Sequence, residues 1–181
     1  MYKQALKTIY TLLPQTGNVS VDAIENAVDM TLSIPLYAGL ERDKLIKELM
    51  SVYSILIENF RIIESDERKR PWISANKSGI KWDFWNRYRD YLAFDKGYPD
   101  SVLNQLDRLT DRTLDGLFNP ETDGIIDKRG LVVGHVQSGK TSNYTGLICK
   151  AADAGFKLII VLAGVHNNLR SQTQLRIDEG F

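Results

Sequence analysis

Eight residues, GHVQSGKT from Gly134 to Thr141, constrain the fold of this 181-residue chain more than any other segment. They match the pattern G-x-x-x-x-G-K-[ST] at every specified position, and a chance match in a chain of this length is on the order of 1%. An apolar run at residues 131–133 precedes the match and a helical pattern follows it, which is the context of a phosphate-binding loop. The segment therefore predicts a site for the phosphates of a nucleoside triphosphate, with ATP as the expected nucleotide.

Each position of the loop has an expected role. The two glycines let the backbone turn tightly and approach phosphate groups, while successive backbone amides point at the anion. Lys140 is the expected catalytic residue because its ammonium stabilises the β- and γ-phosphates, and the Thr141 hydroxyl is the expected Mg²⁺ ligand. The predicted cofactors are ATP and Mg²⁺, and the predicted cofactor-binding residues are Gly134, His135, Val136, Gln137, Ser138, Gly139, Lys140 and Thr141.

The N-terminal part of the chain has the apolar spacing of helices. Val21 to Leu32 follows Ser20, a favourable N-cap residue, and a longer helix is predicted from about Arg42 to Ile63. The apolar residues of that longer helix recur at helical spacing and predict one buried stripe: Leu45, Ile46, Leu49, Val52, Tyr53, Leu56, Ile57 and Phe60.

The period changes after Lys128. Residues 131–133 and 157–163 are short apolar runs that predict strands, and each is followed by a helical pattern. The predicted fold class is therefore α/β, in which a mostly helical N-terminal region is followed by the start (β-α-β-α) of a RecA-like P-loop NTPase parallel sheet. The predicted domains are a helical region at 1–63, a charged linker at 64–71, a helical lead-in at 72–128 and a truncated P-loop NTPase domain at 129–181.

Several other residues have a functional and a structural interpretation. An aromatic stripe could stack nucleobases, but its helical spacing favours a buried core position for Trp82, Trp85, Tyr88 and Leu92. Asp107 and Asp111 lie one helical turn apart and are expected at the surface or in capping positions. The chain has a single cysteine, Cys149, which we expect to be buried in the helix after the loop.

Composition sets further bounds. Basic and acidic residues both number 23, so no overall positive charge indicates a nucleic-acid partner. Residues 129–181, however, hold six basic and three acidic residues, and a mildly basic region suits a polyanion. One cysteine permits no intrachain disulfide, which favours a cytoplasmic location. Neither a membrane-spanning run nor a signal peptide is recognised, so no membrane partner is expected.

A second motif follows the second predicted strand, at Val161 to Thr173. A small polar turn followed by leucine and glutamine is similar to motif Ia of superfamily-two helicases, where the turn contacts a nucleic-acid backbone. Asn167, Asn168 and Arg170 are accordingly the candidate nucleic-acid contacts. The proline, threonine and arginine typical of that motif are absent, and an ordinary capped helix with a polar face is the alternative.

The run from Arg129 to Phe181 resembles the Z-one domain family of bacterial and phage proteins. Upstream, Trp85-x-Arg87-Tyr88 with Tyr91-Leu92 and Leu106-Asp107-x-x-Thr110-Asp111 look like the helical lead-in of that family, so the resemblance covers residues 72–181. It implies a helicase-like, DNA-dependent ATPase or translocase that acts with an endonuclease in restriction-type phage defence. It also implies DNA as the polymer partner, and MORC-type or Hsp90-type ATPases and nucleases as protein partners.

Two other functions fit the same residues: a P-loop small-molecule kinase, and a non-enzymatic module that docks a partner through residues 1–63. A helicase-type ATPase also needs a Walker B acidic pair and an arginine finger, which we expect beyond Phe181. Two strands form too small a sheet to bury their apolar faces. For these 181 residues alone we therefore expect weak or absent nucleotide binding and no steady hydrolysis.

Overall fold

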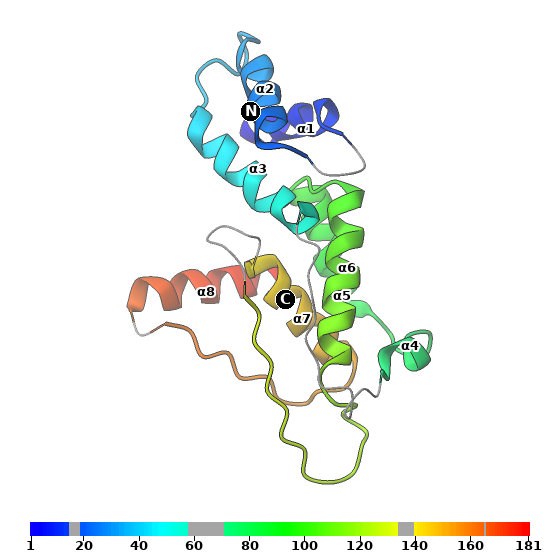
Figure 1. Cartoon of the computed structure of the whole chain (residues 1–181). Helices are drawn as coiled ribbons and strands as arrows, with labels where there is room; N and C mark the ends of the chain where they lie inside the picture. The colour runs from blue at the N-terminus through cyan, green and yellow to red at the C-terminus, as the bar shows by residue number, and fades with distance from the viewer. Residues whose placement is uncertain (15–18, 58–70, 134–139, 165) are drawn as a thin grey trace. The chain divides into compact units, whose positions relative to one another are not determined.

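The computed structural model describes residues 1–14, 19–57, 71–133, 140–164 and 166–181, and helices are its regular elements (Figure 1). In chain order they are α1 (Tyr2–Leu12), α2 (Val21–Leu32), α3 (Arg42–Ile57), α4 (Ile73–Asn76), α5 (Asp83–Asp90), the π-helix η2 (Tyr91–Asp95), α6 (Asp100–Asp115), α7 (Lys140–Asp153) and α8 (Asn167–Gly180).

These elements belong to two compact units. The first comprises Met1–Phe60, Leu92–Gln105 and Gly134–Lys140, and the second comprises Arg61–Tyr91, Leu106–Val133 and Thr141–Phe181. The candidate functional residues from Thr141 onward lie in the second unit, which is therefore described in more detail.

The first unit confirms the predicted N-terminal helices. Helix α2 has the predicted bounds, and the Ser20 hydroxyl caps it by accepting a hydrogen bond from the backbone N–H of Ala23 at 3.2 Å. Helix α3 begins at Arg42 as predicted and is described as far as Ile57, so residues 58–63 of the prediction lie outside the described part. The described side chains of its apolar stripe that are buried are Leu45, Leu49, Val52 and Tyr53.

The second unit is built around α7. Its apolar core joins residues from the α4 region, α6 and α7, namely Trp72, Ile73, Leu114 and Ala151. Carboxylates fix the starts of two of its helices. Asp115 accepts hydrogen bonds from the N–H groups of Trp72 and Ile73 at 3.0 and 2.7 Å. Asp153 accepts from the N–H groups of Phe84 and Trp85 at 3.0 and 2.9 Å, at the start of α5.

The aromatic stripe of α5 is largely buried, and Trp82 packs against this core. Trp85 and Tyr88 are each 4% exposed, and Trp82 is half-buried. Leu92, the next residue of the predicted stripe, is also buried. The predicted burial is confirmed for Trp85, Tyr88 and Leu92. It excludes the Trp85 and Tyr88 rings from base stacking, which needs an accessible ring face.

The predicted parallel sheet is wrong. Among the described residues there is no β-strand, and the segments expected to be strands, 131–133 and 157–163, have no regular structure. Most of their apolar side chains are exposed: Leu131, Val132, Val133, Leu158, Ile160, Val161 and Leu162. A strand is stable only when a neighbouring strand pairs its backbone groups, and two extended segments are too few to bury an apolar face. The described residues therefore do not form the parallel sheet of a RecA-like fold, although the helical parts of that prediction are correct.

Candidate functional site

The site that the sequence predicts lies at the start of α7. Six of its residues, Gly134, His135, Val136, Gln137, Ser138 and Gly139, lie outside the described residues. Lys140 is the first residue of α7 and is exposed, whereas Thr141 is half-buried. The helix predicted after the loop is confirmed, and it ends before Gly155, whose φ of 99° requires the left-handed conformation that glycine adopts without strain.

Most of α7 is enclosed by the second unit. Its buried residues after Thr141 are Ser142, Asn143, Thr145, Gly146, Cys149, Lys150 and Ala151. At Gly146 the helix approaches its neighbours closely, since an added Cβ would lie 3.0 Å from the Trp85 ring and 3.3 Å from the Thr110 methyl. The burial predicted for Cys149 is confirmed, and burial raises the pKa of its thiol to about 12.

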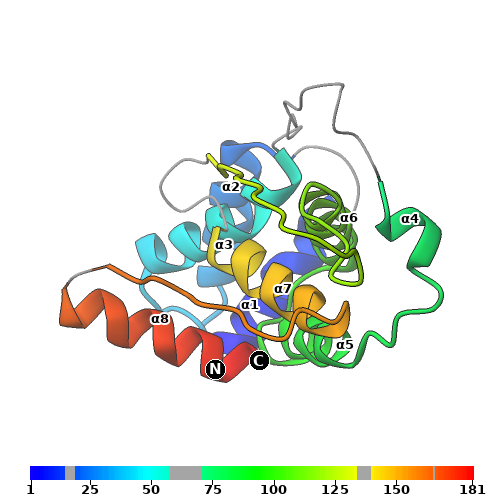
Figure 2. The same cartoon turned by 90° about the horizontal axis from the view of Figure 1, so that it is seen from below.

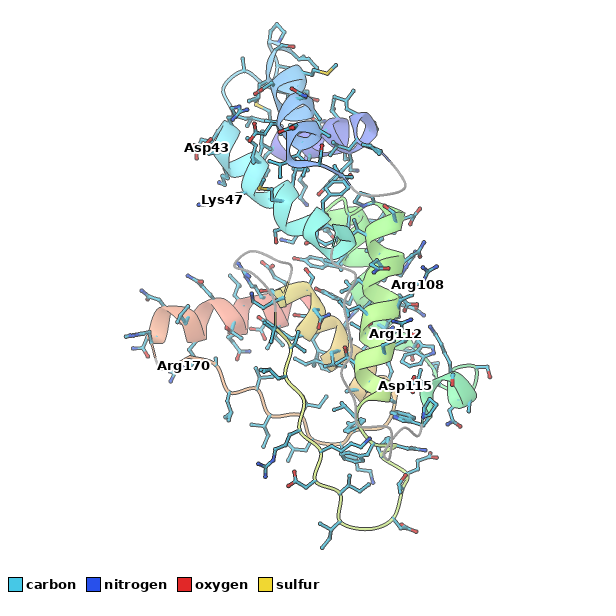
Figure 3. All side chains as sticks on the ribbon, viewed as in Figure 1. Asp43, Lys47, Arg108, Arg112, Asp115 and Arg170 are labelled. Atoms are coloured by element: carbon cyan, nitrogen blue, oxygen red, sulfur yellow. The ribbon has the colours of Figure 1, made fainter. Side chains whose placement is uncertain are left out.

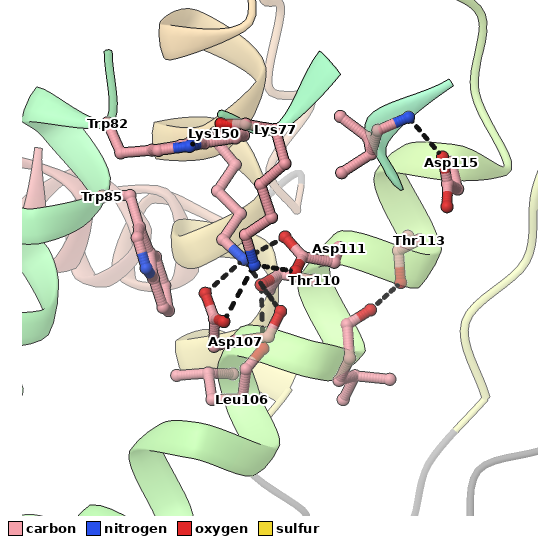
Figure 4. Close-up of polar contacts among 12 residues, drawn as sticks. Lys77, Trp82, Trp85, Leu106, Asp107, Thr110, Asp111, Thr113, Asp115 and Lys150 are labelled. Carbon is pink, nitrogen blue, oxygen red and sulfur yellow. Dashed lines mark hydrogen bonds and ion pairs between the residues drawn. The ribbon is translucent and has the colours of Figure 1, made fainter. Parts of the chain in front are cut away.

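A cluster of four charged side chains ties α7 to α6 (Figure 4). The Lys150 ammonium donates to Asp107 Oδ1 at 2.7 Å, to the Asp107 carbonyl at 2.8 Å, and to Asp111 Oδ1. Lys77 donates to the other oxygen of each carboxylate. The Lys150 side chain is only 1% exposed, and its ammonium lies 4.4 Å from the centre of the Trp85 ring, which adds a cation–π contact.

The charges of this cluster stabilise one another. Burial alone would raise the pKa of Asp107, but the hydrogen bond and charge of Lys150, with those of Lys77, outweigh it and hold that pKa below its usual value. Burial alone would lower the pKa of Lys77, but Asp111 and Asp107 outweigh it and raise that pKa. The expectation that Asp107 and Asp111 have surface or capping roles is therefore wrong: both pair with lysines and fix the position of α7.

Helix α8 packs against α7, and the contacting residues recur every four positions along each helix. Arg176 Nη1 donates to Thr141 Oγ1 at 2.9 Å. One turn further along both helices, an added Cβ at Gly180 would lie 2.9 Å from the Thr145 methyl. One turn beyond that, the Cys149 thiol lies 3.8 Å from the Gly180 carbonyl. Residues four apart share a helix face, so Thr141, Thr145 and Cys149 form a ridge against α8.

The end of α8 is held at further points on α5 and η2. Phe181 stacks on Phe84 with ring centres 4.6 Å apart, and the Tyr91 hydroxyl donates to Glu179 at 2.9 Å. Figure 1 and Figure 2 both show the C-terminal end of α8 beside α7. These contacts place Arg176 at Thr141. Sequence reasoning missed Arg176, and the only available signal was the i, i+4 spacing of Arg176 and Gly180 on a predicted helix.

The candidate nucleic-acid residues lie at the other end of α8. Asn167, Asn168 and Arg170 occupy its first turn and are exposed, and Figure 3 shows Arg170 near the helix start. Arg170 also lines an open cavity of about 610 Å³ between α8 and the segment before it, together with Val161, Ala163, Ser171, Thr173, Gln174, Leu175, Ile177 and Asp178. The structure thus brings the three residues together, and their contact with nucleic acid stays a prediction.

The chemistry of Thr141 and its surroundings fits the predicted cofactors. A hydroxyl oxygen has two lone pairs, so the bond from Arg176 leaves one for a metal ion. Thr145, one turn further along α7, holds a buried hydroxyl that has no hydrogen-bond partner among the described residues. The first turn of α7 therefore presents a lysine, a hydroxyl and the positive end of a helix, with an arginine beside them.

Comparison of the chain with protein-family models, with curated proteins and with solved structures finds no match. The resemblance to the Z-one family accordingly rests on the motifs alone. Within the described ranges, no helix has the length and apolar character needed to cross a membrane.

Proposed function

We propose that this chain binds ATP and Mg²⁺ through residues 134–141. The observation that supports the proposal best is the start of α7 at Lys140, which puts the lysine and threonine of the motif in the first turn of a helix. Unpaired N–H groups and the helix dipole make such a turn a favourable place for an anion. The motif also expects a strand before the loop, and that condition is not met by residues 131–133.

In this proposal each residue has a defined task. Lys140 places a positive charge against the outer phosphates, and the backbone amides of the loop hold the phosphate oxygens. The Thr141 hydroxyl holds Mg²⁺, which when bound neutralises charge on the β- and γ-phosphates. Because α7 is fixed to α6 by the charged cluster, its first turn offers these groups in a fixed orientation.

We further propose that the nucleotide site serves a DNA-dependent ATPase or translocase that acts with an endonuclease in restriction-type phage defence in the cytoplasm. MORC-type or Hsp90-type ATPases and nucleases are its proposed protein partners. The motifs shared with the Z-one family support this proposal, as do the exposed donors of Asn167, Asn168 and Arg170 in the first turn of α8.

The test of nucleotide binding is an amide chemical-shift titration of the 181-residue chain with Mg²⁺·ATP, which also measures weak affinities. We expect saturable shifts in the first turn of α7 and at least a tenfold weaker affinity for Lys140→Ala. Lys157→Ala is the matched control, since Lys157 is exposed on the unpaired segment after α7. Shifts that do not saturate, or equal affinity of the Lys140→Ala chain, would overturn the proposal.

The test of DNA binding is fluorescence anisotropy with a labelled duplex over a series of salt concentrations. Arg170→Ala is expected to weaken binding and to make the salt dependence shallower, because one phosphate contact is lost. ATP hydrolysis that is stimulated by DNA is the expected activity. Binding that is unchanged in the combined Asn167→Ala, Asn168→Ala and Arg170→Ala variant would refute the assignment of α8 to DNA.

A further inference from the structure

Arg176 bonds a residue of the predicted phosphate site, and no motif in the sequence identifies it. Its guanidinium donates to Thr141 Oγ1 at 2.9 Å from a helix that starts 27 residues after α7 does, at Asn167. Arg176 is exposed, and among the described residues its polar partner is the Thr141 hydroxyl, not a buried carboxylate. Its position therefore calls for a functional explanation.

We infer that Arg176 is a phosphate-contacting residue of the nucleotide site, and that it recognises the terminal phosphate of a nucleoside triphosphate. This inference rests on the proposed function. An arginine fork binds phosphate oxygens through two parallel hydrogen bonds, which a hydroxyl cannot replace. The Thr141 hydroxyl is the group that would hold Mg²⁺ on the outer phosphates, so the guanidinium beside that hydroxyl would be within reach of them.

The packing of α8 supports the inference because close contacts at the C-terminal end of this helix fix the position of Arg176. At Gly180, one turn after Arg176, an added Cβ would lie 2.8 Å from the Tyr88 ring and 2.9 Å from the Thr145 methyl. Only glycine permits α8 to come this close to α7 without displacing its neighbours. The stacking of Phe181 on Phe84 holds the same end of the helix. The close contact between α7 and α8 therefore holds Arg176 beside Thr141.

The experiment compares ATP with ADP, since the two ligands differ in the phosphate that Arg176 is inferred to contact. Dissociation constants for the Mg²⁺ complex of each are measured by amide chemical-shift titration of the full chain. Arg176→Ala is expected to weaken ATP binding about tenfold and to leave ADP binding within about twofold. Arg176→Lys keeps the charge without the fork and should recover part of the loss.

Two further variants separate position from charge. Gly180→Ala should displace α8 and reduce the preference for ATP as Arg176→Ala does, although the arginine is still present. Arg108→Ala is the matched control: Arg108 is exposed on α6 (Figure 3), and its loss should leave both affinities unchanged. The amide spectrum of each variant reports whether α7 and α8 keep their fold.

The outcomes distinguish this inference from the proposed function. If the unsubstituted chain binds neither nucleotide, both are overturned. If it binds ATP and the Arg176→Ala chain keeps the same preference for ATP over ADP, only the role of Arg176 is overturned. Tighter ATP binding by Arg176→Ala would also overturn it, because the guanidinium would then compete with Mg²⁺ for the Thr141 hydroxyl.

Discussion

Replacing Lys150 by methionine tests the charged cluster most directly, because methionine is an unbranched side chain of nearly the same length that carries no charge. Lys150 is 1% exposed, whereas the side chains of Asp107 and Asp111 are 29% and 18% exposed. Removing one partner of a buried ion pair costs roughly 3–5 kcal/mol, since the other charge stays buried and unpaired. Lys77 still contacts both carboxylates, so we expect a loss at the lower end, about 3 kcal/mol.

Lys77→Met is the matched control, because Lys77 has the same two acidic partners but a side chain that is 43% exposed. Solvent screens such a pair, and its loss should cost about 0.5–1 kcal/mol. Free energies of unfolding come from urea titrations followed by tryptophan fluorescence, which Trp82 and Trp85 report from beside Lys150.

A double-mutant cycle then checks the mechanism. In an Asp107→Asn background one of the two buried carboxylates is already neutral, so Lys150→Met should cost less there than in the unsubstituted chain. Equal losses for Lys150→Met and Lys77→Met, or an additive cycle, would show that burial of the charge does not determine the stability of this cluster.

Four further outcomes follow from the packing and the titrating groups. Gly146→Ala should cost about 1–3 kcal/mol and lower Tm, because the new methyl meets an indole ring 3.0 Å away. Ser20→Ala removes the N-cap of α2 and should cost about 1 kcal/mol in the same urea titration. Cys149 should react with a thiol reagent at pH 8 only after urea is added, since burial raises the pKa of its thiol to about 12. The pKa of Asp107 is held below its usual value, so its contribution to the free energy of unfolding is present above the unfolded pKa and is lost as pH falls through the folded pKa. The pKa of Lys77 is raised, so its contribution to the free energy of unfolding is present below the unfolded pKa and is lost as pH rises through the folded pKa. Stability that is constant across both ranges would contradict these shifts.

The helices of this chain could be predicted because their signals are local. Ser20 marks the start of α2, and the stripe from Leu45 to Tyr53 marks the buried face of α3, without knowledge of any distant residue. The same holds for α7 and α8, which lie where a helical pattern is predicted after each of the two apolar runs. Propensity and periodicity are sufficient for such elements.

The sheet could not be judged in this way. Residues 157–163 have the composition of a buried strand, but a strand also needs neighbours to pair its backbone, and composition does not say whether they are present. The charged cluster and Arg176 were missed for a related reason. Lys150 and Asp107 are 43 positions apart, and Arg176 and Thr141 are 35 apart, so only the packing of whole helices brings them together.

The two lysines at the ends of α7 show how the fold divides stability from binding. Lys150 is buried between two carboxylates, which neutralise its charge, so Lys150 does not attract a polyanion. Lys140 is exposed at the N-terminal end of the same helix, where the helix dipole adds to its positive charge. A phosphate that approaches the start of α7 therefore meets the positive end of the helix dipole, beside Thr141 and Arg176. Since the cluster at Lys150 sets where that turn lies, its loss should reduce stability first and nucleotide affinity only through the displacement of α7.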